Sequence, residues 1–245
     1  MSRRARLAVF AVAATGFCAL LVWGTTGMPH WGHFNGRYAV ILTKAPVKER
    51  QATNAVTAIV FDYRGLDTMG EEFILFAAVT GVALLLREAR EGMPEPRDEV
   101  DADPVRAVGI ALAACIVVLA LWVIAHGAVT PGGGFQGGVI MASAFLLLWL
   151  AGSLRAYRSV TPTWAVDFVE GAGAGGFVVI GIVALLLGQA FLHNLLPYGL
   201  AGKLSSGGSI PILNWATALA VTAAFLLLFS EFLEERSLVL EERRR

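Results

Sequence analysis

The chain has 245 residues, of which 56% are hydrophobic and 16% are charged, and its mean hydropathy is +0.66. Because an ordinary soluble domain carries more charge, this composition excludes one and predicts an all-α protein embedded in a membrane. The formal net charge of zero argues against the basic surface of a nucleic-acid-binding protein, so we expect the lipid bilayer, and no nucleic acid, as a partner.

Six apolar segments along the chain predict six transmembrane helices. The first follows basic residues, which is typical of both a cleaved signal peptide and a retained signal anchor. Its apolar core, Leu7 to Trp23, is longer than most signal-peptide cores, so we expect the helix to be retained. The six segments lie at 7–24, 69–86, 105–125, 132–151, 170–191 and 211–230.

The distribution of Lys and Arg predicts the orientation in the membrane. With both termini inside, 13 of the 19 basic residues fall on the inner side. Of the six outside, five lie in the long segment 25–68, where charge has less influence on orientation. We therefore expect a multi-pass protein of the cell (inner) membrane with both termini in the cytoplasm.

A stretch rich in acidic residues and proline at 88–104 separates the second apolar segment from the third. It lacks large aromatic residues, so we expect a solvated cytoplasmic linker. Its seven carboxylates show no EF-hand spacing, which leaves a metal site as the weaker alternative. The linker would divide a two-helix unit, 1–87, from a four-helix unit, 105–235, with a charged cytoplasmic tail at 236–245.

The second apolar segment follows an acidic stretch, Phe61 to Glu72, which we call the acidic motif. The apolar run from Phe73 to Leu86 has only 14 residues, whereas a spanning helix needs about 20. Completing the span brings Glu71 and Glu72 to the edge of the hydrocarbon, where an ionised carboxylate is unfavourable. Neutralisation by a proton or a cation would relieve this, so these two acids and Asp67 are candidates for an ion or proton pathway.

The acidic motif also has a purely structural interpretation. Thr68 and Glu71 have the spacing of a capping box, in which each side chain satisfies a backbone amide at a helix start. Asp67 would add favourable negative charge at the same end, and Arg64 could neutralise a neighbouring carboxylate. The residues alone leave open whether the motif only caps a helix or also takes part in ion movement.

His126 to Gly138, which we call the glycine motif, precedes an apolar run of only 13 residues, Val139 to Ala151. A full span must include glycine-rich backbone, which is unfavourable in lipid unless protein or a wet cavity covers it. One interpretation is a broken helix whose amides or carbonyls face a polar path. The other is close packing, because Gly134, Gly138 and Ala142 recur every four residues. His126 could titrate near neutral pH, or could only anchor the helix at the surface.

The segment Glu170-Gly-Ala-Gly-Ala-Gly-Gly176 formally contains Gly-x-Gly-x-x-Gly, but no strand precedes it, so it predicts no dinucleotide site. Gly171 and Gly175 instead have the Gly-x-x-x-Gly spacing of a helix contact. Of the acids, we expect Glu170 to face the protein interior beside that contact, which makes it a further pathway candidate, with a position at the inner surface as an equal alternative. No pattern of catalytic Ser, His, Asp or Cys appears, so we expect no enzymatic site, cofactor or metal in this chain.

The acidic and glycine motifs together resemble the small membrane subunits of Mrp/Mnh-type multisubunit cation/proton antiporters. Asn54 to Glu71 is similar to the MbhE-like region, which in many antiporters ends the large A-type subunit. The glycine motif is similar to the B-type subunit (the MnhB domain), together with Glu170-Gly-Ala, Phe191 to Gly199 and Ser206 to Asn214. As a departure, B-type subunits often carry a glutamate soon after Leu-Asn, where this chain has Ala218 to Val221.

The resemblance implies exchange of cytoplasmic Na⁺, or another monovalent cation, for external H⁺ in a complex with large A/D-type and small C/E/F/G-type subunits. It assigns Asp67 and Glu71 to the family's acidic pattern. Related membrane-bound hydrogenases share these modules, so a membrane-arm subunit of an energy-converting oxidoreductase is the main alternative, ahead of a stand-alone transporter or a scaffold. The family's glycine pattern corresponds to Pro131, Gly132, Gly133, Gly134, Phe135, Gly137 and Gly138.

Overall fold

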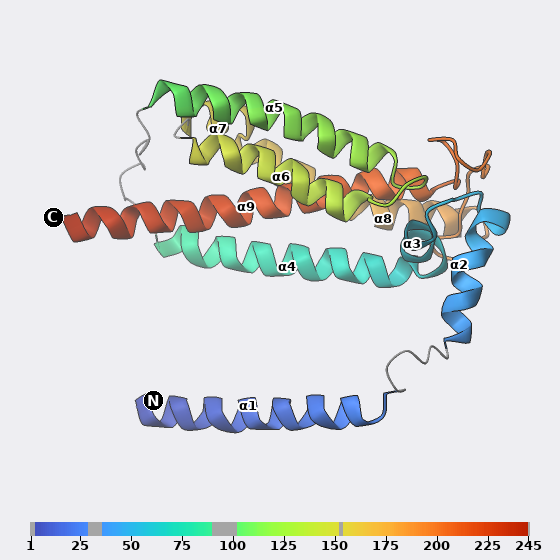
Figure 1. Cartoon of the computed structure of the whole chain (residues 1–245), viewed down its shortest axis with the longest axis horizontal. Helices are drawn as coiled ribbons and strands as arrows, with labels where there is room; N and C mark the ends of the chain where they lie inside the picture. The colour runs from blue at the N-terminus through green and yellow to red at the C-terminus, as the bar shows by residue number, and fades with distance from the viewer. Residues whose placement is uncertain (1–2, 29–35, 90–101, 152–153, 245) are drawn as a thin grey trace. The chain divides into compact units, whose positions relative to one another are not determined.

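The computed structural model describes residues 3–28, 36–89, 102–151 and 154–244, and these contain helices, turns and no strand (Figure 1). The prediction of an all-α protein is therefore confirmed for the described residues. Residues 90–101, most of the predicted acidic linker, lie outside them. The chain divides into two units, Met1–Ile41 and Leu42–Arg245, and each is described by itself.

The unit Met1–Ile41 contains helix α1, Arg3–Thr26. Its segment Leu7–Thr26 is apolar and long enough to cross a membrane, and none of its most apolar stretch is buried. Large side chains such as Phe10 and Trp23 are exposed along it. A helix that is apolar on all sides suits a membrane span better than a water-facing surface.

Five long helices make up most of the described part of the unit Leu42–Arg245. Four of them contain apolar stretches that can span a membrane, whereas α6 has only 17 residues. With α1, the described residues hold five candidate spans, which confirms a multi-pass membrane protein. The five helices are α4 (Gly65–Ala89), α5 (Asp103–Ala125), α6 (Gly134–Leu150), α8 (Thr163–Leu186) and α9 (Ile210–Arg244).

Short helical elements lie where the sequence pattern predicted only connections. α2 (Arg37–Glu49), α3 (Ala55–Ala58) and the π-helix η1 (Ile59–Tyr63) occupy much of the segment 25–68, and α7 (Leu154–Val160) precedes α8. A π-helical turn is rare and is frequently found at functional sites. Because η1 ends at Tyr63 and α4 begins at Gly65, the acidic motif is divided between a π-helix and an α-helix.

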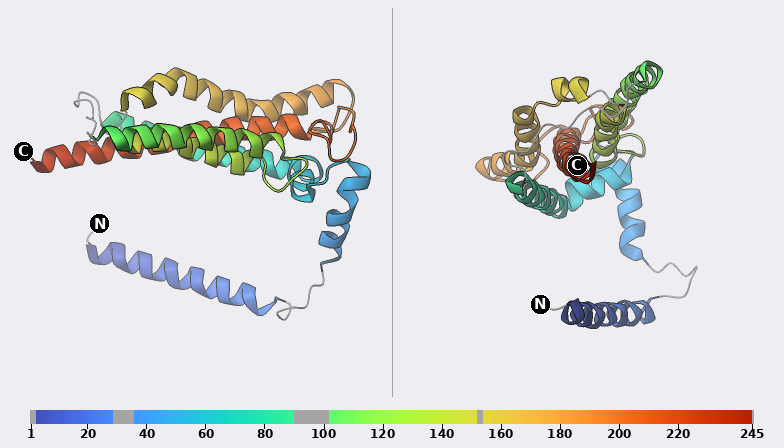
Figure 2. Two further views of the ribbon diagram at one scale, coloured as in Figure 1. Left: turned by 45° about the horizontal axis from the view of Figure 1, so that its top comes forward. Right: turned by 90° about the vertical axis from the view of Figure 1, so that its left-hand side faces the viewer.

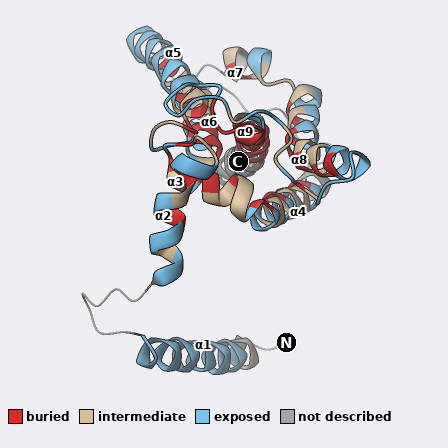
Figure 3. Ribbon diagram, turned by 90° about the vertical axis from the view of Figure 1, so that its right-hand side faces the viewer, coloured by how far each residue is buried: buried red, intermediate tan, exposed pale blue. Residues whose placement is uncertain are grey.

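Helix α9 forms the centre of this unit. α4, α6 and α8 each pack against it, and α5 packs mainly on α6 (Figure 2). The buried faces of these helices point towards α9, while their outer faces are exposed (Figure 3). Ala216, Ala220 and Ala224 of α9 are buried at these contacts, where small side chains let helix backbones approach closely. The core therefore lies along α9.

Helix α4 begins earlier than the apolar pattern predicted, at Gly65 rather than near residue 69. The Thr68 hydroxyl lies inside the first helical turns and donates a hydrogen bond of 2.5 Å to the Val60 carbonyl oxygen. The predicted capping box of Thr68 and Glu71 is therefore wrong. The physical reason is that η1 supplies the turn before α4, which leaves Thr68 within the helix instead of at its N-cap.

Helix α8 runs over Thr163–Leu186, whereas the apolar pattern predicted 170–191. Pro162 takes the N-cap position, with a φ of −65° and an extended ψ of 137°. The Thr161 hydroxyl instead donates to the Tyr157 carbonyl oxygen at 2.7 Å. Pro162, and not the adjacent Thr161, is therefore the N-cap residue of α8.

Candidate functional site

The glycine motif forms a turn between α5 and α6. Helix α5 ends at Ala125, and α6 begins at Gly134 after the N-cap residue Gly133. Gly132 and Gly133 both have a φ of 136°, a backbone conformation that residues with a side chain rarely adopt. The turn therefore requires glycine at these two positions for backbone reasons alone.

Asn214 of α9 satisfies backbone groups on both sides of this turn. Its Oδ1 accepts a hydrogen bond of 2.6 Å from the Gly134 amide, at the start of α6. Its Nδ2 donates a hydrogen bond of 2.6 Å to the Ile124 carbonyl oxygen, at the end of α5. Because Asn214 is fully buried, these bonds replace the water that an interrupted helix would otherwise need.

Two side chains from the start of α3 cover the other polar groups of the turn. The Asn54 Nδ2 donates to the carbonyl oxygens of Gly127 and Thr130 at 2.7 and 2.9 Å, and the Thr57 hydroxyl donates to Gly127 at 2.7 Å. Asn54 also caps α3 by accepting from backbone amides. The sequence pattern did not predict the roles of Asn54, Thr57 and Asn214, although polar residues beside apolar segments were a signal for them.

The small residues of the glycine motif also sit at tight helix contacts. A Cβ at Gly134 or Gly138 would collide with α9, near Asn214 and Val221 respectively. A Cβ at Gly137 would collide with Ile124 of α5. α6 therefore needs glycine on two sides at once. Of the other motif residues, Pro131 is exposed and Phe135 is half-buried.

The sequence pattern predicted a helix contact through Gly171 and Gly175 of α8, and the described chain makes no such contact. A Cβ at either residue would meet nothing within 4 Å in the described chain. A Cβ at Gly173 would instead collide with the α9 backbone at Ala220, and one at Gly176 with Ala216. The reason is helical phase: residues 170, 173 and 177 share the buried face of α8, and 171 and 175 point away from it.

Three carboxylates of the acidic motif, those of Asp67, Glu71 and Glu72, lie in different environments. Asp67 is exposed and accepts a hydrogen bond of 2.6 Å from the Arg64 Nε. Glu71 is exposed on the surface of α4, whereas Glu72 is 1% exposed and lies in the core beside α9. Consecutive helical residues differ by about 100° in direction, which is why two adjacent acids face outward and inward.

Glu72 is enclosed without a hydrogen bond. Among the described residues, neither of its carboxylate oxygens has a hydrogen-bond partner, and the same holds for the Thr217 hydroxyl of α9. The Thr217 hydroxyl is close enough to influence the carboxylate, but the two groups do not meet hydrogen-bond geometry. A buried polar group without a partner is unfavourable, so Glu72 is an exceptional feature of the core.

The two remaining pathway candidates lie on other helices. Glu170 is buried on α8, one turn from Gly173 and therefore on the side of α8 that contacts α9. His126 follows the last residue of α5, with its Nδ1 2.9 Å from the Trp122 carbonyl oxygen. Its ring stacks on the Trp122 ring with centroids 4.6 Å apart, an arrangement that suits an anchor. The structure does not bring His126 and the acidic motif together in any contact between described residues.

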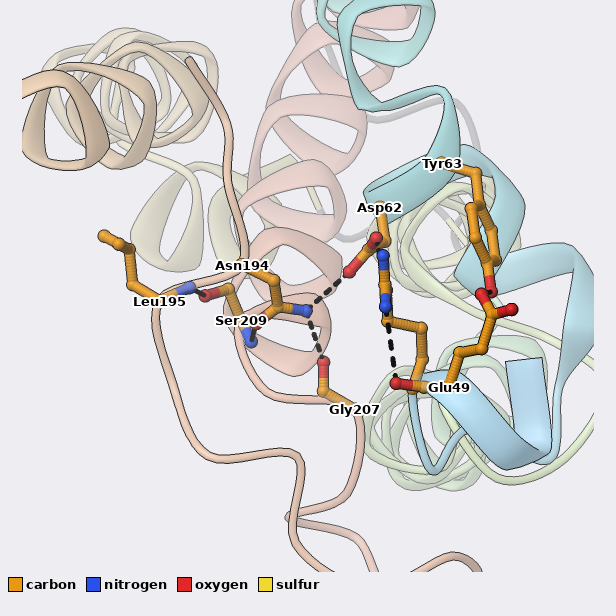
Figure 4. A network of polar contacts seen from close by, with 8 residues as sticks. Glu49, Asp62, Tyr63, Asn194, Leu195, Gly207 and Ser209 are labelled. Carbon is orange, nitrogen blue, oxygen red and sulfur yellow. Dashed lines mark hydrogen bonds and ion pairs between the residues drawn. The ribbon is translucent and has the colours of Figure 1, made fainter. Parts of the chain in front are cut away.

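A polar cavity of about 570 Å³ lies at the end of the bundle where α4 begins. We call it the rim cavity. At its wall Arg50 donates from Nε to Asp62 at 2.7 Å. The Asn194 amide donates to the other oxygen of Asp62 at 2.7 Å (Figure 4). The Arg50 guanidinium lies over the rings of Tyr63 and Tyr198, 5.1 and 5.3 Å from their centroids. This network connects η1 to the segment before α9.

The electrostatics of the rim cavity keep Arg50 charged and Tyr63 neutral. Burial by itself would lower the pKa of Arg50, but the hydrogen bond and charge of Asp62 outweigh it and place the pKa above its ordinary value. Burial, together with a hydrogen bond of 2.7 Å to Glu49, raises the pKa of Tyr63 to about 12. Asp67 also lines this cavity, so one predicted pathway candidate opens into it.

Comparison with known proteins gives one family and several relatives. Residues 104–227 match the family described as a domain related to the MnhB subunit of Na⁺/H⁺ antiporters. A probable A/B subunit of a K⁺/H⁺ antiporter from Rhizobium meliloti is 30% identical over 176 residues, which are 62% of this chain and 17% of that protein.

Two solved structures are similar over nearly the whole chain. A chain of the archaeal membrane-bound sulfane sulfur reductase, a respiratory membrane complex, has a TM-score of 0.74 and 30% identity, with 95% of this chain and 99% of that chain covered. A chain of the Mrp complex of a Dietzia species has a TM-score of 0.67 and 27% identity, with 94% of this chain and 26% of that chain covered.

Proposed function

Since this chain belongs to the MnhB family of proteins related to a Na⁺/H⁺ antiporter subunit, we propose that it is an integral-membrane component of a multisubunit cation/proton antiporter. The family match over 104–227 is the observation that carries the proposal, and the likeness to a chain of the Mrp complex supports it. In this proposal the chain moves Na⁺ or another monovalent cation and H⁺ together with its partners, and it has no catalytic site of its own.

The proposal includes six membrane spans with both termini in the cytoplasm. Five helices qualify as spans by length and composition, and α6 becomes the sixth if the turn before it lies within the membrane. The hydrogen bonds from Asn54, Thr57 and Asn214 support this placement, because they satisfy the backbone of the turn without bulk water. The units 1–87 and 105–235 are then the MbhE-like and MnhB-like parts.

The candidate pathway residues divide into two groups in this proposal. Asp67 and Glu71 are exposed in this chain, so they are placed to face partner subunits or water, with Asp67 at the rim cavity. Glu72 and Glu170 are buried and act within the bundle, beside α9. His126, stacked on Trp122, anchors the end of α5 at the same end as the glycine turn.

Antiport in inside-out vesicles tests this function. In this experiment, cells that lack the native chain express either the native chain or a variant, and cation-driven proton movement is measured in their vesicles. We expect the native chain to restore this movement. Glu71→Gln keeps the shape of the side chain and removes its charge, so we expect antiport to fall about tenfold or more. Asp103→Asn, an exposed acid in the first turn of α5, is the matched control and should keep native activity. Normal antiport with Glu71→Gln would show that this acid has no role in ion movement.

The partner subunits are tested by affinity purification of the native complex. We expect large A/D-type and small C/E/F/G-type antiporter subunits to co-purify with this chain, as the likeness to chains of two multisubunit membrane complexes supports. Mass spectrometry of the purified complex identifies them. A chain that purifies alone and still supports transport in liposomes would contradict the proposal of a multisubunit complex.

A membrane-arm subunit of an energy-converting oxidoreductase is the second candidate. It is favoured by the similarity to a chain of the sulfane sulfur reductase complex, which covers 99% of that chain. The same purification separates the two functions, because redox subunits with iron–sulfur centres would co-purify only in the oxidoreductase. In that case ion movement would depend on an electron donor rather than on a cation gradient alone.

A further inference from the structure

Glu72 is enclosed by residues of its own chain, and in this respect it differs from the adjacent acid, Glu71. With 1% exposure, it is out of reach of lipid, bulk water and partner subunits, whereas its neighbour Glu71 is exposed. Its surroundings are therefore complete in this chain. Any role of Glu72 in ion movement must be explained by the helices that enclose it, chiefly α4 and α9.

The groups that face Glu72 offer it no compensating positive charge. On its own helix the charged neighbour is Glu71, a second acid, and from α9 the polar neighbour is the Thr217 hydroxyl. The nearby basic residues Arg50 and Arg64 pair with Asp62 and Asp67, not with Glu72. An ionised carboxylate without a cation or hydrogen-bond donors is strongly disfavoured in such a core.

A proton fits this site better than a metal cation. Hard cations take several oxygen ligands, and the described residues contain no group of three or more His, Cys, Asp or Glu side chains that could hold a metal ion. A proton needs only the carboxylate itself. The protonated acid becomes neutral and can donate a hydrogen bond to the Thr217 oxygen after a small side-chain rotation.

A line of buried polar side chains connects Glu72 to the turn of the glycine motif. Thr217 lies one turn along α9 from Asn214, and both contact the site where Gly134 lacks a side chain. Asn214 and Thr57 both border Gly133, and Thr57 bonds to Asn54 at 2.7 Å. We call Asn54, Thr57, Asn214 and Thr217 the polar seam. All four are buried, and the seam leads from the turn to the Glu72 carboxylate.

We propose that Glu72 and Thr217 form a proton-binding site inside the bundle, loaded and unloaded through the polar seam. In the loaded state the Glu72 carboxylic acid donates to the Thr217 oxygen. In the unloading step the O–H bond of Glu72 breaks, the proton passes to water that enters the seam, and the Thr217 hydroxyl rotates to donate to the carboxylate. Loading is the reverse. The role of this site in turnover rests on the proposed antiporter function, whereas the protonated state of Glu72 does not.

Carbodiimide labelling tests the protonated state in the whole complex in native membranes. Dicyclohexylcarbodiimide reacts with protonated carboxyl groups in apolar surroundings, and peptide mass spectrometry locates the adduct. We expect labelling of Glu72 at neutral pH and less labelling as the pH rises. Thr217→Val, which removes the hydroxyl, should displace the pH profile, whereas Thr222→Val on the same helix should not, because the Thr222 hydroxyl bonds to Ala218. Absence of labelling at every pH would overturn the site.

Antiport measurements test whether the proton exchanges during turnover. Glu72→Gln keeps the volume of the side chain but cannot carry a proton, so we expect cation-driven proton movement to fall about tenfold or more, with Glu72→Asp retaining part of it. Co-purification of the partner subunits checks that each variant assembles. Native antiport with an assembled Glu72→Gln complex would overturn the exchange role, even if Glu72 is labelled.

The two proposals fail in different ways. If the native complex shows no antiport but Glu72 is labelled with the expected pH profile, the antiporter function is wrong and the proton site stands. If the native complex is active, Glu71→Gln lowers activity and Glu72 is neither labelled nor required, the proton site is wrong and the antiporter function stands.

Discussion

Asn214 shows how one side chain can hold together an interruption between two helices. Its amide accepts from the first amide of α6 and donates to one of the last carbonyls of α5, so it replaces hydrogen bonds that a continuous helix would make itself. Asparagine suits this position because it is short, neutral and both donor and acceptor. An ionised acid has no donor, and a hydroxyl must donate and accept from a single oxygen atom.

Substitutions of Asn214 should therefore have graded effects on stability. Asn214→Asp keeps the acceptor for Gly134 and loses the donor to Ile124, whereas Asn214→Leu loses both. Because each unsatisfied buried backbone group costs about 1–3 kcal/mol, we expect Asn214→Leu to be the more destabilising of the two. The thermal unfolding temperature of the purified complex measures this. Gln189→Leu, at an exposed amide side chain outside the turn, is the control. Equal unfolding temperatures for Asn214→Leu and the native complex would contradict this account of the turn.

At the scale of the helices, the sequence predicted the existence of elements better than their faces. Each of the six apolar segments corresponds to a helix, although the bounds differ, because apolar runs of this length have few other structures in a membrane. The apolar segment of α8 was placed at 170–191 because Asp167 and Glu170 interrupt the apolar pattern near the start of the helix. The faces of α4 and α8 could not be predicted, because the phase of a helix depends on the partner it packs against. The length of the apolar run predicted that both Glu71 and Glu72 lie at the edge of the hydrocarbon. The structure is needed to see that Glu71 is exposed and Glu72 is buried.

The phase of α8 gives a prediction for its glycines. A side chain at Gly173 meets the backbone of α9 at Ala220, whereas the same side chain at Gly171 meets no atom of the described chain. Overpacking of a tight contact costs about 1–3 kcal/mol, so Gly173→Ala should lower the unfolding temperature of the purified complex and Gly171→Ala should not. The paired variants carry the same substitution two residues apart. An effect of Gly171→Ala as large as that of Gly173→Ala would show that the assigned face of α8 is wrong.

For the whole molecule, the resemblance inferred from the acidic and glycine motifs is confirmed by the family match and by the likeness to the Mrp complex. Those motifs were informative because they lie at the positions where polar or strained backbone enters the core. The polar seam and the rim cavity could not be predicted, because each joins residues more than a hundred positions apart in the chain, such as Asp62 and Asn194. The proposed orientation in the membrane depends on the charge distribution and is open to direct measurement.

Cysteine labelling tests that orientation. In a variant with Cys18 and Cys115 replaced by serine, we expect a cysteine at Lys203 to react with an impermeant maleimide from outside intact cells. A cysteine at Arg243 should react only in inside-out vesicles, because the positive-inside rule places the tail in the cytoplasm. Lys203 lies in an exposed segment and α9 continues to Arg244. Reaction of both cysteines from the same side would show that the number of spans between them is not the one proposed.

The central position of α9 has a consequence for how this protein is made. α9 follows α4, α5, α6 and α8 in the chain and leaves the ribosome after them. α4 and α8 are therefore inserted into the membrane before the helix that both pack against has been made. α5 and α6 can already associate as a hairpin at that stage. The Glu72 side chain on α4, in contrast, is not yet enclosed by α9. The nascent chain must therefore keep this acid unenclosed until α9 is made, and burial of the Glu72 carboxyl group follows the synthesis of α9.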